Sequence, residues 1–387
     1  MALSPRAGRY IKQDSFYAAF IPESLPPVPP IRIDDEFQTL LSKADRALGR
    51  LDGSIQTLPD PDLFVFMYVR KEAVLSSQIE GTQSSLNDVL EAEAAISDVH
   101  RPKDVDEVLN YVNAMNHGLA RLGELPISIR LIKEIHEKLL HGVRGRHMNP
   151  GEIRRSQNWI GPPGSTLNEA VFVPPPPHEV ERLLSDLEKF IHGDDPIPPL
   201  IKIGLIHAQF ETIHPFLDGN GRIGRLLITF FLCLKEILIK PVLYLSHYFK
   251  ANRQQYYELL QKVRDEGDWE EWIKFFLRGV ATVSLEATET ARSIVSLREM
   301  HRNRITEQFG RAAGNGLRVL ENLYRRPYVS VSQVRDQLGI SFPPASDLVQ
   351  RMVDADVLVE ITGQDRYRIY QYTPYIHLFS DPDRRSM

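Results

Sequence analysis

The segment HPFLDGNGRIGR, His214–Arg225, combines a histidine, an aspartate, three glycines and two arginines within a short stretch. The residues before it, LIKIGLIHAQFETI, have the length and periodicity of a helix, and an apolar helical stretch follows the glycines. Glycines between two helices let backbone N–H groups converge at the start of the second helix, where the helix dipole favours negative charge. The segment therefore predicts an anion-binding loop in an α-helical fold.

Residues Gly219 to Gly224 also satisfy the glycine spacing of dinucleotide-binding folds. Such folds need a strand before the glycines and an acidic residue roughly 20 positions later, at the end of a second strand. The sequence has helical patterns at the first place and no strand with such an acid at the second. It also lacks the Gly-Lys-Ser/Thr of a P-loop, so we expect a different kind of phosphate site.

The charged residues of this segment suggest how it binds phosphate. Arg222 and Arg225 are three residues apart and can reach the same anion from the first turn of a helix. Asp218 would repel a bare phosphate, and an Mg²⁺ ion between the two removes this conflict. His214 is then a titratable base beside a metal-bound phosphate, which suits it to activate an attacking hydroxyl.

The composition is that of an ordinary globular protein. The chain has 387 residues, a formal net charge of −5 and 42% hydrophobic residues, which predicts two or three domains at about 150 residues each. The single cysteine, Cys233, excludes an internal disulfide or a thiolate zinc cluster and favours a cytoplasmic location. The longest apolar run, 226–234, is shorter than the roughly 20 residues of a spanning helix, and no secretory signal is evident, so we expect no membrane partner.

Helical periodicity dominates the first 300 residues. We predict helices at 63–79, 86–96, 105–122, 127–140, 179–192, 198–213, 221–236, 253–265 and 268–297. The proline-rich residues 21–31 favour an extended arm, and AVFVPPPP at 170–177 favours an exposed edge strand or flap. The expected fold class is mainly α, with one short β-hairpin flap.

The C-terminal region has a different pattern. Helical runs at 317–324, 331–338 and 344–354 precede two strand-like runs at 357–361 and 367–372, the order of a winged helix-turn-helix. Acidic residues and arginines balance over this region, whereas DNA-binding modules are usually basic. We therefore leave DNA binding and protein docking equally open, with Arg366 and Arg368 as the best phosphate contacts for DNA.

The segment 214–225 is similar to the signature of Fic-domain proteins, which reads His, any residue, Phe, any residue, Asp or Glu, Gly, Asn, Gly, Arg, two variable residues, Arg. Each fixed position is filled, by the residues His214, Phe216, Asp218, Gly219, Asn220, Gly221, Arg222 and Arg225. The resemblance continues through GEIR at 151–154, the flap, and LYLSHYF at 243–249, to about residue 277. It covers most of the chain.

This resemblance implies an enzyme that transfers AMP from ATP, with Mg²⁺, to a Ser, Thr or Tyr hydroxyl of a protein. It makes His214 the base and Asp218 the metal ligand, and it gives the γ-phosphate to Arg225. The phosphate-binding set is then Gly219, Asn220, Gly221, Arg222, Gly224 and Arg225. It further implies that the target backbone pairs with the flap at Val171, Phe172, Val173 and Pro174, and Tyr257 is a candidate for the adenine pocket.

A second motif of the same family occurs at Ser76, Glu80 and Gly81, where Ser76 and Glu80 share a helix face. A carboxylate in a last helical turn opposes the helix dipole, so Glu80 needs a cationic partner or good solvation. In the Fic proteins that carry this motif, the glutamate pairs with the second arginine and blocks the γ-phosphate position. We therefore expect autoinhibition through Glu80 and Arg225.

Two other functions remain open from the sequence. The same glutamate orients water for AMP removal in some Fic proteins, and a nucleotide-sensing DNA-binding regulator would use the winged helix. The resemblance also gives the expectation of a homodimer, and the protein itself is one candidate target.

The predicted organisation is an arm and inhibitory helix region at 1–100, a Fic core at 101–290, a linker helix at 291–316 and a winged helix at 317–387. His207, two turns before His214, suggests a metal partner, but core packing is the better interpretation because this chemistry needs no second imidazole. Cys233 is interpreted as a small core residue.

Overall fold

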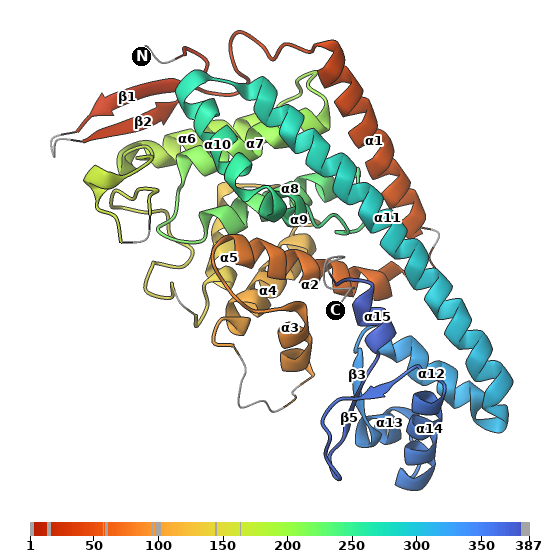
Figure 1. Ribbon diagram of the computed structural model, residues 1–387. Coiled ribbons are helices and arrows are strands. Elements are labelled where there is room, and N and C mark those ends of the chain that lie inside the picture. Colours follow the sequence, from red (N-terminus) through yellow and green to blue (C-terminus); the bar gives the residue numbers. More distant parts are fainter. Residues whose placement is uncertain are drawn as a thin grey trace.

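The structure is a computed structural model that describes residues 4–13, 17–56, 58, 61–94, 96, 102–143, 145–162 and 164–380. These residues form a large helical body and a smaller C-terminal domain, joined by one long helix (Figure 1). The helices of the body are α1 (Asp35–Gln56), α2 (Pro61–Ile79), α3 (Leu86–Glu93), α4 (Val105–Arg121), α5 (Ile129–Leu139), α6 (Pro177–His192), α7 (Pro199–Ile213), α8 (Asn220–Leu234), α9 (Ser246–Ala251), α10 (Arg253–Glu266) and α11 (Trp269–Gln308). The mainly α prediction is confirmed.

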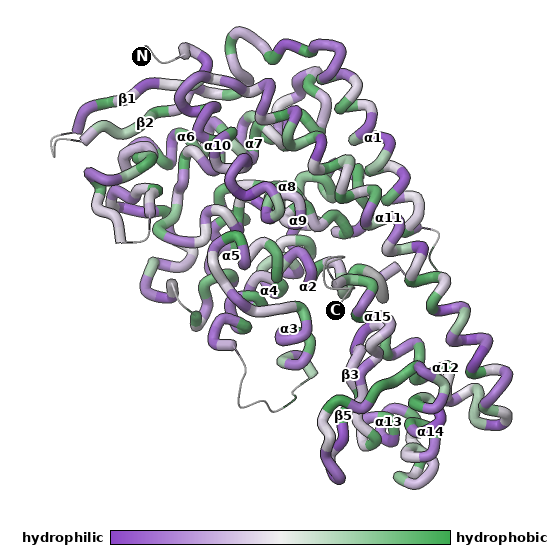
Figure 2. The backbone as a smooth tube through the Cα atoms, viewed as in Figure 1, coloured by the Kyte–Doolittle hydropathy of each residue, from purple (hydrophilic) through white to green (hydrophobic). Residues whose placement is uncertain are grey.

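The two helices that flank the decisive segment lie in the interior. Every residue of α7 from Leu200 to Ile213 is buried, and so is most of α8. A helix that is apolar on all sides is stable only when other elements surround it. The outer helices α1 and α11 instead alternate between hydrophobic and hydrophilic residues along the tube in Figure 2. The segment 214–219 is therefore a link between two helices of the core.

Helix α1 was missed by the sequence prediction. It lies along α11 (Figure 1), and Lys274 of α11 forms ion pairs with Asp34 and Glu36 at the start of α1. Its buried face comprises Phe37, Ala44, Ala47, Leu48, Leu51 and Ile55. This three-to-four residue spacing is a helical signal that we passed over because the preceding prolines drew the interpretation towards an arm.

The expectation of one β-flap in an otherwise helical body was also wrong. An antiparallel hairpin of β1 (Gly8–Lys12) and β2 (Ala18–Pro22) precedes α1. The predicted flap contributes a single bridge, between Ile160 and Phe172, rather than two strands. The proline-rich arm is left with residues 23–34, which contain neither helix nor strand. The hairpin was missed because β2 is short and buried, so it lacks the alternating pattern of a half-exposed strand.

The C-terminal domain contains α12 (Ala313–Leu323), β3 (Tyr328–Ser330), α13 (Val331–Leu338), α14 (Phe342–Asp354), β4 (Val359–Glu360), β5 (Ile369–Gln371) and α15 (Thr373–His377). The strands form an antiparallel sheet in the order β3-β5-β4. The predicted helices and hairpin are present, and the strand β3 was not predicted. The boundary predicted at 290/291 falls inside α11, and the one at 100/101 lies outside the described residues.

The end of the chain returns to the helical body. Phe379 packs edge-on against Tyr68 of α2 at a ring-centroid distance of 5.2 Å, and the Tyr68 hydroxyl donates to the Ala287 carbonyl of α11. The C-terminal residues thus pack against helix α2. Within the described residues, no helix has the length and apolar character needed to cross a bilayer.

Substitution of Gly118 tests the packing around α8, and substitution of Gly49 is its control. A Cβ at Gly118 of α4 would lie 2.3 Å from the buried Phe230 ring of α8. We expect Gly118→Ala to lower the free energy of unfolding by about 1–3 kcal/mol, because the ring has no open space to move into. Gly49 in α1 is exposed with nothing near its Cβ position, so Gly49→Ala should raise it by about 0.5–1 kcal/mol. Chemical denaturation of both variants checks this, and a neutral Gly118→Ala would contradict the close contact.

Candidate active site

Two left-handed residues shape the loop between α7 and α8. His214 ends α7 with φ 49° and ψ 61°, and Gly219 precedes α8 with φ 80°. Glycine adopts this conformation freely, whereas it is uncommon for histidine. These two residues turn the chain from the end of α7 to the start of α8.

The side chain of Asn220 holds the loop rather than a ligand. Its Oδ1 accepts the Phe216 N–H at 2.9 Å, and its Nδ2 donates to the Phe216 carbonyl at 2.9 Å. We expected Asn220 to belong to the phosphate-binding set. Because its amide is committed to Phe216, what it offers to an anion is the backbone N–H at the start of α8.

His136 of α5 is a loop-positioning residue that the sequence analysis missed. Its Nδ1 accepts the Gly151 N–H at 2.9 Å, so Nε2 carries the proton and donates to the Asp218 carbonyl at 3.0 Å. The imidazole also stacks on Phe216, with ring centroids 3.8 Å apart. Burial lowers the pKa of His136 to about 4, which keeps the ring neutral. Its place on the buried face of an amphipathic helix was visible in the sequence, but its partner was not.

Arg154 and Asn158 hold the backbone at the turn. The His214 carbonyl accepts from Arg154 Nε at 2.9 Å and from Asn158 Nδ2 at 3.3 Å. The Arg154 N–H donates to the Pro215 carbonyl at 3.0 Å, and its guanidinium also reaches the Pro175 carbonyl beside the flap. These bonds stabilise the uncommon backbone conformation of His214 and connect it to the flap.

The imidazole of His214 is neutral and oriented. Its Nδ1 lies 3.3 Å from the Glu211 carbonyl, which can only accept, so Nδ1 carries the proton and Nε2 is left as the acceptor. Burial and the positive charges of Arg264 and Arg154 lower the pKa of His214 to about 3. The group is therefore in the form that a general base requires.

Arg225 is buried and bonded to the end of α2. Its Nε donates to Ser76 Oγ at 2.8 Å, and its Nη2 donates to the Ser76 carbonyl at 3.0 Å and to Glu80 Oε1 at 2.6 Å. The predicted contact between Glu80 and Arg225 is confirmed. Burial would raise the pKa of Glu80, but the attraction of Arg225 outweighs it and holds that pKa below its ordinary value. Gly81 follows in the left-handed region, φ 99°, as expected at this helix end.

The Glu80 carboxylate lies directly on the first turn of α8. A Cβ at Gly221 would come within 2.2 Å of Glu80 Oε1. The first N–H groups of a helix have no acceptor within the helix, and the dipole there attracts anions. Glu80 thus occupies the anion position that the glycines create.

Arg222 supplies a second buried cation. It is 1% exposed, and its Nη1 and Nη2 lie 3.5 Å from Glu107 Oε2 and Asp218 Oδ1. Among the described residues, Nε and Nη1 of Arg222 have no hydrogen-bond acceptor. Buried guanidinium donors are expensive to leave unbonded, so this geometry favours an anionic ligand here.

The Asp218 side chain fits a substrate-held Mg²⁺. Its Oδ1 accepts the Gly219 N–H at 2.7 Å, and the side chain is 36% exposed. In the part of the chain that is described, no group of three or more His, Cys, Asp or Glu residues is arranged for a metal. Mg²⁺ commonly binds through one or two carboxylates together with substrate phosphates, which this arrangement permits.

The flap is less open than predicted. Both the N–H and the carbonyl of Phe172 bond to Ile160, and the Val173 carbonyl accepts the Phe20 N–H of β2 at 2.9 Å. Phe172, Val173 and Pro174 are buried, whereas Val171 is 63% exposed. The hairpin β1–β2 therefore already covers part of the edge on which a target strand was expected.

Gly224 lies where α8 packs against α7. A Cβ there would lie 2.5 Å from Glu211 Oε1 and 3.3 Å from His207 Cε1. His207 is a core residue, as preferred from the sequence. Its Nδ1 donates to the Gly224 carbonyl at 3.0 Å, and Tyr256 OH donates to its Nε2 at 2.8 Å.

Tyr257 of α10 lies close to the site, and Cys233 does not. The Tyr257 ring is 41% exposed, and its pKa is raised by burial and by the nearby negative charge of Glu80. Its ring centroid lies 5.1 Å from that of Tyr256, whose hydroxyl bonds to His207. Cys233 is partly exposed, in a cavity with Asp62 and Lys240, so it is less buried than expected.

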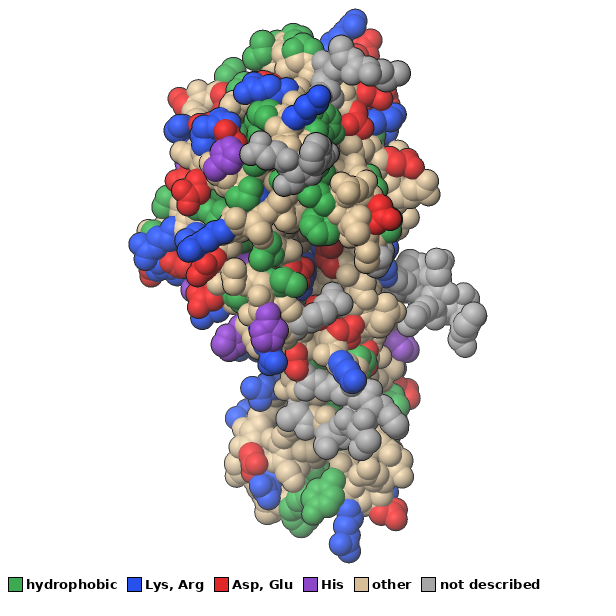
Figure 3. Space-filling view, turned by 90° about the vertical axis from the view of Figure 1, so that its left-hand side faces the viewer, with side chains coloured by type: hydrophobic (Ala, Val, Ile, Leu, Met, Phe, Trp, Pro, Cys, Tyr) green, Lys and Arg blue, Asp and Glu red, His purple; other side chains and the backbone are tan. Residues whose placement is uncertain are grey.

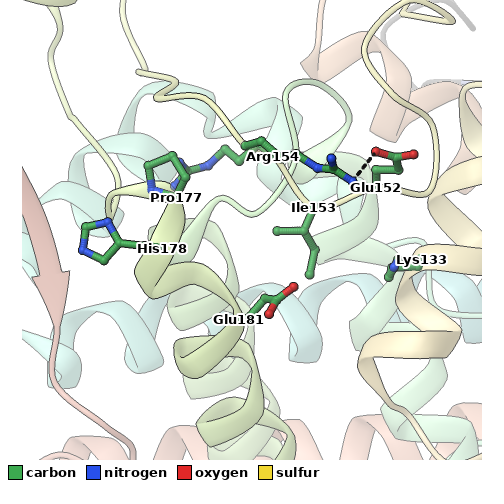
Figure 4. A pocket seen from close by; sticks show the side chains of 8 residues that line it. Lys133, Glu152, Ile153, Arg154, Pro177, His178 and Glu181 are labelled. Carbon is green, nitrogen blue, oxygen red and sulfur yellow. Dashed lines mark ion pairs between the residues drawn. The ribbon is translucent and has the colours of Figure 1, made fainter.

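Two cavities are lined by residues that contact the loop. One of about 450 Å³ is lined by Lys133, Glu152, Ile153, Arg154, Arg155, Pro177, His178 and Glu181. Figure 4 shows it beside the start of α6, and two of its lining residues, Glu152 and Arg155, form an ion pair. Another of about 720 Å³ reaches Glu107 and Gly145, and Gly145 lies against Asp218. Arg154 thus lines the first cavity and also bonds to the His214 carbonyl, and Gly145 of the second cavity lies against Asp218.

The comparisons with known families agree with this geometry. The family description "Fic/DOC family N-terminal" matches residues 38–120, and "Fic/DOC family" matches residues 126–232, which ends within α8. The chain belongs to the Fic/DOC family. The Fic signature thus coincides with the loop His214–Arg225, and the N-terminal family region contains Ser76 and Glu80.

Related proteins show how far the similarity extends. A protein adenylyltransferase Fic of Drosophila grimshawi is 30% identical over 176 residues, 44% of this chain and 31% of that protein. One of Drosophila yakuba is 28% identical over 253 residues, 62% of this chain and 45% of that protein. The chain thus spans less than half the length of these curated relatives. A Fic family protein from Desulfovibrio desulfuricans G20 shares the fold, with a TM-score of 0.59, 20% identity, and coverage of 89% of this chain and 97% of that one.

The ion pair at the end of α2 predicts a pH-dependent stability. Because the pKa of Glu80 is lowered in the folded protein, its contribution to stability is present above the unfolded pKa of 4.5 and is lost as the pH falls through the folded value. We expect Glu80→Gln to melt below the wild type at pH 7, and the difference to shrink below pH 4. The exposed Glu307 of α11 provides the control variant Glu307→Gln. A constant difference across this range would contradict the ion pair.

Proposed function

We propose that this Fic protein is a protein adenylyltransferase, which transfers AMP from ATP to a Ser, Thr or Tyr hydroxyl of a protein. The observation that carries the proposal is the juxtaposition of a neutral, oriented His214 with the anion-binding start of α8 and the buried Arg222 and Arg225. Its relatives in Drosophila are named protein adenylyltransferases, which supports the same reaction class.

The proposed reaction is a displacement at the α-phosphorus. The target hydroxyl oxygen forms a bond to the α-phosphorus. The bond between the α-phosphorus and the oxygen that bridges to the β-phosphate breaks. Pyrophosphate leaves, and the hydroxyl proton passes to Nε2 of His214. Since Nδ1–H is held by the Glu211 carbonyl, Nε2 is the nitrogen that is available for this proton.

The loop provides the positive charge for the triphosphate. Backbone N–H groups at the start of α8, the unbonded donors of Arg222, and Arg225 are the proposed phosphate ligands. Asp218 would hold Mg²⁺, which when bound neutralises phosphate charge and stabilises the leaving pyrophosphate. Tyr257 is the proposed neighbour of the adenine.

The Glu80 carboxylate is proposed to inhibit the reaction. It lies against Gly221 and on Arg225, so a terminal phosphate cannot approach the same N–H groups or the same guanidinium. The Glu80 carboxylate and a terminal phosphate would repel each other at this position. The nucleotide therefore binds with its phosphates displaced from the in-line position. Removing the carboxylate should leave the N–H groups at the start of α8 and the Arg225 guanidinium available to the γ-phosphate.

The protein target is proposed to dock beside the flap. Val171 is exposed there, and the remaining backbone edge lies next to β2, so the hairpin β1–β2 forms part of the docking surface. A homodimer and a cytoplasmic location stay predictions, and the protein itself remains a candidate target.

AMP removal is the second candidate function for the same site. It is favoured by one observation: the Glu80 carboxylate lies against the start of α8, the helix that follows the His214 loop, and its negative charge acts on His214. The DNA-binding regulator receives less support. In the described C-terminal residues, Arg351 pairs with Asp347 at 2.8 Å on α14, and Figure 3 shows acidic and basic side chains interspersed over that domain. Protein docking is the use that we propose for it.

The proposed function is tested by labelling protein with ATP that carries a radioactive α-phosphate. Wild type, Glu80→Gly and Glu80→Gly/His214→Ala would be incubated with Mg²⁺, each alone and with a cell extract as the source of targets. We expect label on protein to rise at least tenfold in Glu80→Gly, because Arg225 becomes available, and to vanish in the double variant.

A control with ATP labelled on the γ-phosphate should leave no label on protein, since pyrophosphate departs. Absence of α-label from all three proteins, with ATP binding intact, would contradict AMP transfer. Release of AMP from a previously modified protein by the wild type but not by Glu80→Gly would instead establish the removal reaction.

A further inference from the structure

Arg264 of α10 is a buried arginine that the reaction described above does not use. It is 5% exposed, and its hydrogen bonds go to the end of α7 and to its own helix. Its Nη2 donates to the Glu211 carbonyl at 3.2 Å, its Nε to Thr212 Oγ1 at 3.3 Å, and its Nη1 to Gln261 Oε1 at 3.3 Å. These acceptors are all uncharged, so its positive charge is not neutralised by the groups that bind it.

One carbonyl connects Arg264 to the base. The Glu211 carbonyl oxygen accepts the Arg264 Nη2–H and also the Nδ1–H of His214, at 3.3 Å. That carbonyl fixes which nitrogen of His214 carries the proton and which way the ring faces. A guanidinium bonded to Glu211 and Thr212 together holds the last turn of α7, and with it the carbonyl, in one position.

The same guanidinium touches the flap. Its Cζ lies 4.1 Å from the centre of the Phe172 ring, within the range of a cation–π interaction. Phe172 also packs on Phe20 of β2, with ring centroids 5.7 Å apart. Arg264 therefore lies between the element that carries the base and the element beside which the target hydroxyl is expected.

Arg264 also contributes to the electrostatics of His214. Besides burial, the charged groups that act on this imidazole are Arg264 from α10, Arg154 from the segment before the flap, and Glu80 from α2. The two arginines disfavour its protonation, and Glu80 acts in the opposite direction. Removing Arg264 alone therefore makes His214 easier to protonate.

We propose that Arg264 is a positioning residue for AMP transfer, which sets the tautomer and orientation of His214 relative to the flap. This inference rests on the proposed function, in which Nε2 takes the proton of the target hydroxyl. Arg264 touches neither nucleotide nor target in this account. It acts through the Glu211 carbonyl and through Phe172.

The test uses the whole 387-residue chain, with Glu80→Gly as the active parent. Arg264→Met removes the charge and the hydrogen bonds, and Arg264→Lys keeps the charge but lacks the planar fork that bonds two residues at once. Lys262→Met, at an exposed position of the same helix, is the matched control. AMP transfer is measured as kcat and as KM for ATP from pH 9 down to the lowest pH at which the protein stays folded. The His214 ring nitrogens are titrated over the same range by ¹⁵N NMR, with His214→Gln providing the assignment.

We expect kcat to fall roughly 10- to 100-fold in Arg264→Met with little change in KM for ATP, because the base is misplaced while the phosphate ligands are intact. The acid limb of the kcat profile should move to higher pH, and the His214 titration should rise with it. In Arg264→Lys the limb should stay near that of the parent while kcat still falls. Lys262→Met should behave like the parent.

A purely structural role would lower the melting temperature and the active fraction without moving the titration or the pH limb, and that result would overturn the proposal. So would an unchanged kcat in Arg264→Lys, which decides the matter if Arg264→Met does not fold. The NMR titration does not depend on activity. If the parent transfers no AMP, the proposed function fails, while the titration still shows whether Arg264 controls the tautomer of His214.

Discussion

The rest of the site depends on one interaction, the binding of an anion at the first turn of α8. The start of this helix is buried, its first N–H groups have no acceptor within the helix, and Arg222 and Arg225 add two buried positive charges. Positive charge in a low-dielectric interior is unfavourable unless an anion balances it. Glu107 and Asp218 provide anions for Arg222, and Glu80 provides the anion for Arg225. The contact between Glu80 and Arg225 also ties α2 to the core. A triphosphate would satisfy the same groups, so the carboxylate and the nucleotide compete for one position.

The loop can present these groups because many distant residues hold its backbone. His136 of α5 fixes the Asp218 carbonyl, Arg154 and Asn158 fix the His214 carbonyl, and Asn220 binds Phe216 on both its N–H and its carbonyl. The loop also joins two buried helices, so it cannot relax by moving their ends. A preorganised loop of this kind needs little rearrangement when a phosphate arrives, which is the condition for electrostatic catalysis. Helix α2, which carries Glu80 next to its end, is held by contacts with another part of the chain, such as that of Tyr68 with Phe379 of the C-terminal segment.

The sequence was most informative where chemistry requires particular residues at a fixed spacing. The anion-binding loop His214–Arg225 was predicted from local order, helix ends and charge, whereas the pair Ser76 and Glu80 was identified by the resemblance to Fic proteins. The position of Glu80 at a helix end predicted a cationic partner or good solvation, and the resemblance to Fic proteins pointed to Arg225 as that partner. The structure places these groups in contact, whereas their roles in the reaction stay proposals.

Other features depend on contacts between distant parts of the chain. His136 and Arg264 are single polar residues on otherwise apolar helix faces, and nothing near them in the sequence names their partners. Asn220 and Gly224 were assigned to phosphate, but their surroundings commit the first to Phe216 and the second to the packing of α7 on α8. The hairpin β1–β2 escaped prediction because a short, fully buried strand has no alternating pattern. Its contact with Val173 changes the expected docking edge, which shows why strand pairing cannot be inferred from one strand alone.

The central claim is that Glu80 and the terminal phosphate of the nucleotide compete for the same position. Crystal structures of the wild type and of Glu80→Gly, each with Mg²⁺ and a non-hydrolysable ATP analogue, test it most directly. We predict that in Glu80→Gly a terminal phosphate oxygen lies beside Gly221 and bonds to Arg225, and that in the wild type the carboxylate keeps this position and the phosphates lie elsewhere. A terminal phosphate bonded to Arg225 in the wild type, with the contact between Glu80 and Arg225 still intact, would contradict the account.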